Sequence, residues 1–177
     1  MIITISGLPG SGKSTIGKIL AQKLGYKFYS MGDLRGKTAL QRGMTIDELN
    51  KLGETEEWTD KDIDAYQEKL GKTENNFIVD GRLSFHFIPQ SFKIFLDVDP
   101  GSGAERVFKH QRPDEAQVAT PEELRKMMLK RVGDDDLRYK KYYSVSFRDK
   151  SKFDLVVDTT DLTPTQILDR IMRVLPK

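Results

Sequence analysis

The stretch IITISGLPGSGKST, residues 2–15, joins a β-branched apolar run to a segment with helical periodicity. Residues 2–6 have the composition of a buried strand. From Lys13 to Leu24 the apolar residues fall on one helical face, and Gly25 follows as a helix stop. The glycine-rich residues between the two segments therefore form a turn from a strand into a helix.

This turn matches the pattern G-x-x-x-x-G-K-[ST] of a phosphate-binding loop. Glycines let successive backbone amides curl around an anion, and the helix that follows adds the positive end of its dipole. We expect Lys13 to reach the β and γ phosphates of ATP, Ser14 to bind Mg²⁺, and Thr15 to place a hydroxyl near a distal phosphate. A plain glycine-rich turn is the alternative, but the position between strand and helix favours the phosphate loop. The predicted loop consists of Gly7, Leu8, Pro9, Gly10, Ser11, Gly12, Lys13, Ser14 and Thr15.

Four further apolar runs have the composition of strands, and helical patterns separate them. The runs are YKFYS at 26–30, NFIVDG at 76–81, FKIFLDV at 92–98 and FDLVVDT at 153–159. Capping-box patterns predict helix starts after Thr45, Thr120 and Thr163. Two regions, about 33–71 and 101–144, are helical without an intervening strand. This order predicts an α/β fold of three αβα layers, with a five-stranded parallel sheet and two helical insertions.

The 177-residue chain has a formal net charge of +2 and no cysteine. This nearly neutral charge argues against nucleic-acid binding driven by bulk charge, so we expect no nucleic-acid partner. The lack of cysteine excludes disulfides, thiolate metal ligands and a cysteine nucleophile. We find neither an apolar run of membrane-spanning length nor the pattern of a signal peptide. We therefore expect a cytoplasmic monomer with no membrane partner.

The segment IVDGR, residues 78–82, ends a predicted buried strand with a carboxylate and a guanidinium group. Asp80 lies at the carboxyl end of the strand, where parallel α/β sheets bind ligands, and it is a candidate to hold Mg²⁺ through water. Arg82 has the planar fork that suits a phosphate on an acceptor substrate. The alternative is an Asp-Gly turn followed by a solvated arginine.

The segment SMGDLRG, residues 30–36, ends the second predicted strand. Ser30 and Asp33 are candidates to hydrogen-bond a sugar or a base, and Arg35 is a candidate to hold a phosphate. Helix capping by Ser30 or Asp33 is an equally good interpretation.

The segment TDKDIDAYQ, residues 59–67, places Asp60, Asp64 and Gln67 on one face of a predicted helix. Their oxygens and the amide suit the amino groups or hydroxyls of a nucleobase or a ribose. A solvated helix face is the alternative.

Arg131 and Arg138 are seven residues apart, so they share a helical face in the second helical region. Such arginines can neutralise charge during phosphoryl transfer. The alternative is ordinary surface charge, in which Asp134 pairs with Arg138. Three further basic residues that precede this helix are candidates to join the two arginines in a clamp on the transferring charge, namely Arg106, Lys109 and Arg112.

Among phosphate-loop proteins, these residues favour a small kinase. A GTPase would carry a guanine-reading Asn-Lys-x-Asp after a late strand, and the sequence has none. A large ATPase would use a longer chain. A small kinase needs the phosphate loop, a second anion site and mobile cations, and the sequence offers a candidate for each.

The chain resembles the archaeal-type cytidylate kinases, which are nucleoside monophosphate kinases. The matching stretches run in the family's order and cover most of the chain. They are ITISGLPGSGKST, SMGDL, ALQRGMTIDELNKLGE, DKDIDAYQ, NNFIVDGRL, FKIFLDV, RYKKYY and FDLVVDTT.

The resemblance implies transfer of the ATP γ-phosphoryl group to CMP or dCMP, with Mg²⁺ as cofactor and small nucleotides as partners. It implies catalytic roles for Lys13, Arg82, Arg131 and Arg138, with Arg82 on the acceptor phosphate. It places the acceptor-binding residues Asp60, Asp64 and Gln67 in a monophosphate-binding arm at about 34–71. A lid follows at about 109–144, and the core of this single domain, 1–177, comprises about 1–33, 72–108 and 145–177.

The sequence departs from the family pattern at three places. Arg35 comes one position earlier than the family's arginine, Ser84-Phe85-His86 replaces a common Ala-Gly-Trp, and Asp136 replaces a common basic residue of the lid. These departures leave other acceptors open: AMP, UMP or a small non-nucleotide. A slow ATPase that acts as a regulatory or assembly factor is the alternative from another functional class.

Overall fold

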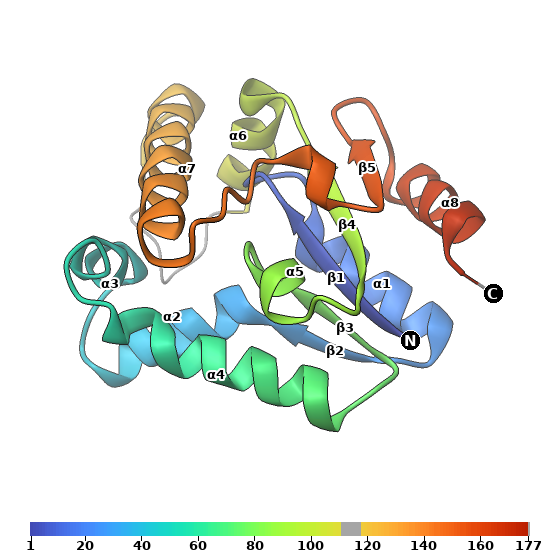
Figure 1. The fold of residues 1–177 in the computed structure, drawn as a ribbon. Helices are drawn as coiled ribbons and strands as arrows, with labels where there is room; N and C mark the ends of the chain where they lie inside the picture. The colour runs from blue at the N-terminus through green and yellow to red at the C-terminus, as the bar shows by residue number, and fades with distance from the viewer. Residues whose placement is uncertain (111–117, 177) are drawn as a thin grey trace.

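A computed structural model describes residues 1–110 and 118–176. Within these residues the chain forms one parallel five-stranded sheet in the order β2-β3-β1-β4-β5 (Figure 1). The predicted α/β class and all five predicted strands are confirmed, with ends that differ by one or two residues. The strands are β1 (Ile2–Gly7), β2 (Lys27–Ser30), β3 (Phe77–Asp80), β4 (Phe92–Asp97) and β5 (Leu155–Asp158).

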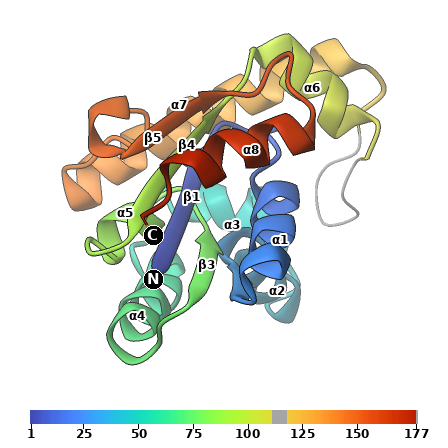
Figure 2. The ribbon, with the colours of Figure 1, turned by 90° about the vertical axis from the view of Figure 1, so that its right-hand side faces the viewer.

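Helices cover both faces of the sheet, which gives the three predicted layers (Figure 2). Helices α1 and α8 pack on one face, and α4, α5 and α7 lie on the other side. A short 3₁₀ turn at Lys150–Lys152 precedes β5. The helices are α1 (Lys13–Leu24), α2 (Met31–Gln41), α3 (Ile46–Leu52), α4 (Trp58–Thr73), α5 (Ser84–Phe87), α6 (Pro100–Phe108), α7 (Pro121–Tyr143) and α8 (Pro164–Val174).

The alternation of side chains along the strands divides the core between the two faces. Ile3 and Ile5 of β1 pack with Leu20 of α1 and Ile171 of α8, and all four side chains are fully buried. On the opposite face, Val79 of β3 joins a cluster that holds α2 and α4. A second cluster on that face, around Phe95 and Phe147, holds the C-terminal part of α7.

Strand order brings the ligand-binding candidates to one edge of the sheet. The central strand β1 pairs with β3 on one side and β4 on the other, with Ile5 opposite Asp80 and Gly7 opposite Leu96. The carboxyl ends of these strands therefore meet where the order of connections reverses, which is where open α/β sheets bind ligands. The glycine-rich loop starts at this point.

Two of the three predicted capping boxes form. The side chains of Thr45 and Thr163 each accept from the third backbone N–H of their helix, and Glu48 or Gln166 returns the bond. At Thr120 only one of the two hydrogen bonds of the predicted capping box forms. Its hydroxyl accepts from Glu123 N, but the Glu123 carboxylate accepts from Ala119 N instead, because it reaches one residue further back.

Of the helices in the described residues, none has the length and apolar character needed to cross a membrane.

The fully buried Leu20 tests the packing of α1 on the sheet. Leu20→Ala leaves a cavity that the surrounding β-branched side chains cannot fill, so we expect the free energy of unfolding to fall by about 2–5 kcal/mol. Urea denaturation followed by circular dichroism measures the change. As the control, Val174→Ala at an exposed position of α8 shifts that free energy by less than about 0.5 kcal/mol. Equal losses in both variants would contradict this packing.

Candidate active site

The loop after β1 has the backbone conformation that glycine permits. Gly7, Gly10 and Gly12 have φ angles of 144°, 76° and 87°. A Cβ on Gly10 would lie 2.3 Å from the carbonyl oxygen of Gly103 in α6, so loop and helix pack backbone against backbone. Only glycine combines this left-handed conformation with so close an approach. The loop is therefore shaped by contact with α6 as well as by its own residues.

Arg106 of α6 ties the loop to the segment after β5. Its Nη2 donates at 2.8 Å to the carbonyl oxygens of both Thr159 and Thr160, and Nη1 donates at 3.4 Å to Gly10 O. This guanidinium supports the loop from its backbone side, which corrects the expectation that Arg106 belongs to a clamp on transferring charge. Lys109 is exposed. Arg112 lies outside the described residues.

A cavity of about 370 Å³ lies against the loop. Of the predicted phosphate-loop residues, Pro9, Gly10 and residues 12–15 line it. Gly7, Leu8 and Ser11 support the loop instead: the Leu8 N–H donates to Leu96 O at 3.1 Å, and Ser11 O accepts from the Thr159 hydroxyl at 3.2 Å. The other lining residues are Ser30, Gly32, Asp47, Asp80, Gly81, Arg82, Val107, Leu124, Met127, Met128 and Arg131.

Lys13 extends back over the loop, and its Nζ donates to Leu8 O at 2.8 Å. Burial, with a further effect from the positive charge of Arg82, lowers the pKa of Lys13 from 10.5 to about 7. The nearby Asp80 opposes this shift. The site thus holds a lysine whose positive charge has little compensation, and an anion bound in the cavity would supply it.

Ser14 and Asp80 both line this cavity, and the Ser14 hydroxyl donates to the Asp80 carboxylate. Burial raises the pKa of Asp80, against hydrogen bonds from Ser14 and Ser30 that lower it. Hard oxygen donors of this kind suit Mg²⁺, which keeps several waters and shares its remaining positions with substrate phosphates. In residues 1–110 and 118–176 there is no cluster of three or more His, Asp or Glu side chains with metal-binding geometry. The two residues therefore fit a magnesium ion that a bound nucleotide helps to hold.

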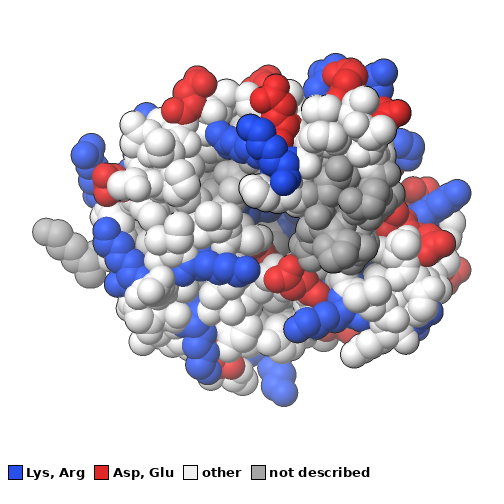
Figure 3. Space-filling model, turned by 180° about the vertical axis from the view of Figure 1, so that it is seen from behind, with Lys and Arg blue, Asp and Glu red and all other residues white. Residues whose placement is uncertain are grey.

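A second cavity, of about 110 Å³, adjoins the first. Gly32, Gly81, Arg82 and Arg131 line both cavities. The remaining lining residues come from α2, α3, α4, α7 and the segment after β3: Met31, Arg35, Ile46, Asn50, Asp60, Ile63, Asp64, Gln67, Leu83, Asp135, Arg138 and Tyr139. Seen from behind, the molecule is hollowed near the middle, and basic side chains border the hollow (Figure 3).

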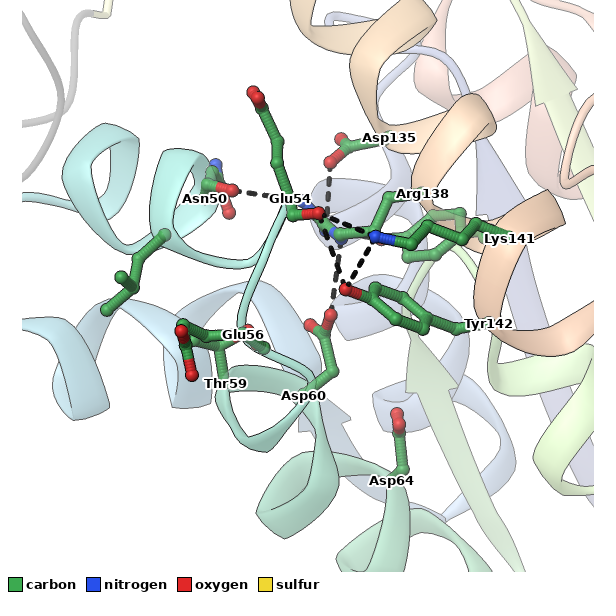
Figure 4. A network of polar contacts seen from close by, with 12 residues as sticks. Asn50, Glu54, Glu56, Thr59, Asp60, Asp64, Asp135, Arg138, Lys141 and Tyr142 are labelled. Atoms are coloured by element: carbon green, nitrogen blue, oxygen red, sulfur yellow. Dashed lines mark hydrogen bonds and ion pairs between the residues drawn. The ribbon is translucent and has the colours of Figure 1, made fainter.

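A chain of buried ion pairs forms one wall of the second cavity. Arg35 pairs with Asp60, Arg138 contacts Asp60 at 3.2 Å and Asp135 at 2.9 Å, and Asp135 pairs with Arg82. Figure 4 shows Arg138 between the two carboxylates. Three guanidinium groups thus alternate with two carboxylates, so the chain has a formal charge of 3 − 2 = +1. It connects α2 and α4 to α7 and to the residues after β3.

The structure revises the predicted pairing along α7. Arg131 and Arg138 share a face, as expected, and both line the second cavity. The suggested pair of Asp134 with Arg138 is wrong: Asp134 binds Lys130 at 2.5 Å, and Asp135, three residues before Arg138, binds Arg138 at 2.9 Å.

Asp136, where the sequence departs from the family pattern, is buried and is not among the residues that line either cavity. It pairs with Lys140 at 2.8 Å and accepts from the Ser146 hydroxyl at 2.6 Å. Its carboxylate therefore fixes the segment that leaves α7.

The predicted substrate residues divide into two groups. Asp60, Asp64 and Gln67 line the second cavity together, as their shared helical face predicts. Arg35 also lines it but is nearly buried, with Nε donating to Asn50 Oδ1 at 2.7 Å. The Ser30 hydroxyl caps α2 by accepting from the Asp33 N–H at 3.2 Å, so the capping interpretation is confirmed. Ser30 also lines the first cavity. Asp33 is not among the residues that line either cavity.

Sequence reasoning missed Asp135, Ser84 and Tyr143. Asp135 carried a signal, because it lies four residues after Arg131 and three before Arg138. Ser84 stands in a departure from the family pattern, but nothing in the sequence pointed to its partner or to that of Tyr143. Their partners are Gln67 and Asp64, which lie 17 and 79 residues away in the chain.

The parallel sheet, the phosphate loop and the paired cavities define a P-loop kinase fold. Shikimate kinase from Bacteroides thetaiotaomicron shares this fold, with a TM-score of 0.68 at 18% sequence identity over 98% of this chain and 97% of that one.

Residues 2–161 match the model of the cytidylate kinase-like family, and the chain belongs to that family. A relative from Archaeoglobus fulgidus, named cytidylate kinase, is 33% identical over 98% of this chain and 93% of its own. The chain also matches 35% of the length of a relative from Lacinutrix mariniflava, named S-adenosylmethionine-dependent nucleotide dehydratase, at 32% identity. The protein is thus a kinase, a phosphotransferase enzyme.

The lowered pKa of Lys13 predicts that nucleotide binding takes up a proton. At pH 8 most of the lysine is neutral, since its pKa is about 7. A bound triphosphate raises that pKa, so the lysine becomes protonated, and we expect uptake approaching about one proton per nucleotide. Calorimetry of a non-hydrolysable ATP analogue with Mg²⁺, in buffers of different ionisation enthalpy, measures this uptake.

Lys13→Met should abolish the uptake, whereas Lys18→Met, at an exposed position of the same helix, should retain it. The same uptake in the Lys13 variant would assign the proton to another group.

Proposed function

We propose that this kinase transfers the γ-phosphoryl group of ATP to CMP or dCMP, giving ADP and CDP or dCDP. The observation that carries the proposal is the meeting of the two cavities at Arg82 and Arg131. A donor held by the phosphate loop and an acceptor held in the second cavity would have their phosphates between these two arginines. Transfer between phosphates requires such placement of two anions in line.

On the donor side, the loop amides and Lys13 hold the triphosphate. The three glycines with positive φ turn the backbone of the loop, and the N-terminus of α1 directs its dipole at the anion. Ser14 and Asp80 would hold Mg²⁺, which would supply positive charge to neutralise the β and γ phosphates.

On the acceptor side, Arg82 binds the monophosphate. The guanidinium carbon of Arg82 lies 5.3 Å from the centroid of the Phe147 ring, and its Nη1 pairs with Asp135, so two side chains hold its orientation. The formal charge of +1 on the ion-pair chain favours an incoming anion, and Arg131 adds a further cation at the junction. In this proposal α2, α3 and α4 form the acceptor arm, about 34–71, and α7 belongs to the lid, about 109–144, of which 111–117 lie outside the described residues.

The residues of the acceptor arm have two roles: some hold arginine side chains, and others face the position of the base. Asp60 is bound on both sides by Arg35 and Arg138, so its carboxylate positions these two side chains. Asp64 and Gln67 belong to the same cavity wall and are left to contact the base or ribose.

The reaction requires no general base, because the acceptor phosphate oxygen is already an anion. The arginines neutralise charge on the transferring group, and Lys13 contributes once it is protonated. Leu124, Met127 and Met128 of α7 give the first cavity an apolar wall that keeps water from the transferring phosphoryl group.

A panel of acceptors tests the proposal. Purified protein with ATP and Mg²⁺ is offered CMP, dCMP, UMP, AMP, GMP, shikimate or no acceptor, and ADP formation is followed. We expect rapid turnover with CMP and dCMP and a much slower rate without acceptor. Equal slow turnover in all samples would favour a regulatory ATPase. Faster turnover with another acceptor would make that compound, and not CMP or dCMP, the proposed substrate.

Arg82→Ala tests the proposed acceptor-phosphate site. Loss of a charge-assisted contact should lower kcat/KM for CMP by about 100-fold or more, while the affinity for ATP changes less than about threefold. Steady-state kinetics with each substrate varied in turn separates the two effects. Arg125→Ala, at an exposed pair with Glu122, is the matched control and should leave both parameters unchanged. A similar loss of kcat/KM for CMP and of affinity for ATP would contradict the assignment of Arg82 to the acceptor site.

A further inference from the structure

Asp64 and Gln67 occupy successive turns of α4 and face the same cavity. Gln67 is only 3% exposed, and its Oε1 accepts from the Ser84 hydroxyl at 2.6 Å. Its Nε2 has no partner among the residues that the structure describes. Tyr143 donates to Oδ2 of Asp64, and Oδ1 likewise has no partner in the described part of the chain.

This wall of the cavity therefore offers a hydrogen-bond acceptor beside a donor. The pyrimidine edge of cytosine has the complementary order: the 4-amino group donates and N3 accepts. Uracil has the reverse order, with O4 as an acceptor and N3–H as a donor. A carboxylate that accepts from the 4-amino group of cytosine is one of the established pairings of side chains with bases.

We propose that Asp64 and Gln67 select cytosine over uracil, with the Asp64 carboxylate accepting from the 4-amino group and the Gln67 amide donating to N3. This assignment rests on the proposed function. Uracil would place O4 against the carboxylate and N3–H against the amide N–H, which leaves both pairs repulsive.

Residues outside the arm fix both polar groups. Ser84, which is fully buried, orients the Gln67 amide, and it lies two residues after Arg82. Tyr143, in the last turn of α7, holds the Asp64 carboxylate. The base-reading pair is therefore tied to the proposed phosphate arginine at one point and to the lid helix at the other.

The protonation state of Asp64 decides whether it accepts or donates. Burial raises its pKa to about 7, aided by Asp60 and Glu68 on its own helix, while Tyr143 of α7 and Arg35 of α2 oppose the shift. The ring of His86 of α5 lies near that of Tyr143, with the ring centroids 6.1 Å apart. Below this pKa, Asp64 is a neutral carboxyl whose O–H suits uracil O4. Above it, the carboxylate suits cytosine.

Preference for cytosine should accordingly rise with pH. The measured quantity is the ratio of kcat/KM for CMP to kcat/KM for UMP between pH 5.5 and 8.5, which reports groups of the free enzyme. We expect the ratio to rise through about pH 7 in the unmodified protein, following the Asp64 pKa.

Asp64→Asn is the decisive variant, because its amide can donate to O4 at every pH. We expect the CMP-to-UMP ratio to fall by about 10- to 100-fold at pH 8 and to lose its pH dependence. Asp62→Asn, at an exposed position of the same helix, should keep both the ratio and its pH profile. Tyr143→Phe removes a hydrogen bond to the carboxylate, so it should move the midpoint of the profile to higher pH.

Gln67→Glu provides an independent test if Asp64→Asn fails to fold. It replaces the donor to N3 by an acceptor, so CMP should lose at least tenfold in kcat/KM relative to UMP. An unchanged ratio in the folded variants, or equal use of CMP and UMP by the unmodified protein, overturns the base assignment and leaves the kinase proposal standing. Turnover of no nucleoside monophosphate overturns the proposed function and the base assignment with it.

Discussion

The pairing of β1 with β3 is the constraint on which the site depends. Four residue pairs set this register, and the Gly81 N–H extends it by donating to Ile5 O at 3.1 Å. Because the strands are parallel, the phosphate loop after β1 and the Asp80-Gly81-Arg82 segment after β3 leave the sheet at the same edge. A shift of one residue would exchange the faces of β3 and turn Asp80 away from Ser14. The hydrogen bond between these two side chains requires this register.

The ion-pair chain orients side chains, whereas the apolar core stabilises the fold. Taking charges out of water is costly, and a buried ion pair recovers that cost only with good geometry and additional hydrogen bonds. Arg35 has such bonds, to Asn50 and to the carbonyl oxygen of Thr59. The contribution of the chain is therefore orientation: it holds arginines that would otherwise be mobile at the edge of a cavity. It also joins elements that the apolar clusters leave separate, since α2 and α4 pack in one cluster and the C-terminal part of α7 in another.

Local patterns in the sequence were sufficient for the sheet and the loop. Runs of β-branched residues predicted the five strands, and the spacing of Gly7, Gly12 and Lys13 predicted the phosphate loop, because both depend on neighbours in the chain. The shared faces of Asp60, Asp64 and Gln67, and of Arg131 and Arg138, followed from helical geometry. What the sequence left open depends on the packing of one element against another. Arg106 donates to carbonyl oxygens of two distant loops, and backbone acceptors leave no trace in the residue types.

Helix α7 runs past both cavities and connects their chemistry. Its 23 residues extend over about 34 Å. Residues at intervals of three or four lie on one face, so Leu124 and Met128 line the first cavity, Arg131 lines both, and Asp135 and Arg138 line the second. Tyr143 ends the series beside Asp64.

One helix therefore lines the first cavity and the junction where the phosphates would meet, and it ends at the tyrosine that binds the carboxylate proposed to read the base. Any displacement of α7 changes all three contacts at once. An acceptor that completes hydrogen bonds at Asp64 would hold Tyr143, and with it the helix that carries Arg131 and Arg138. Recognition of the base and placement of the arginines would then be two consequences of the same helix position.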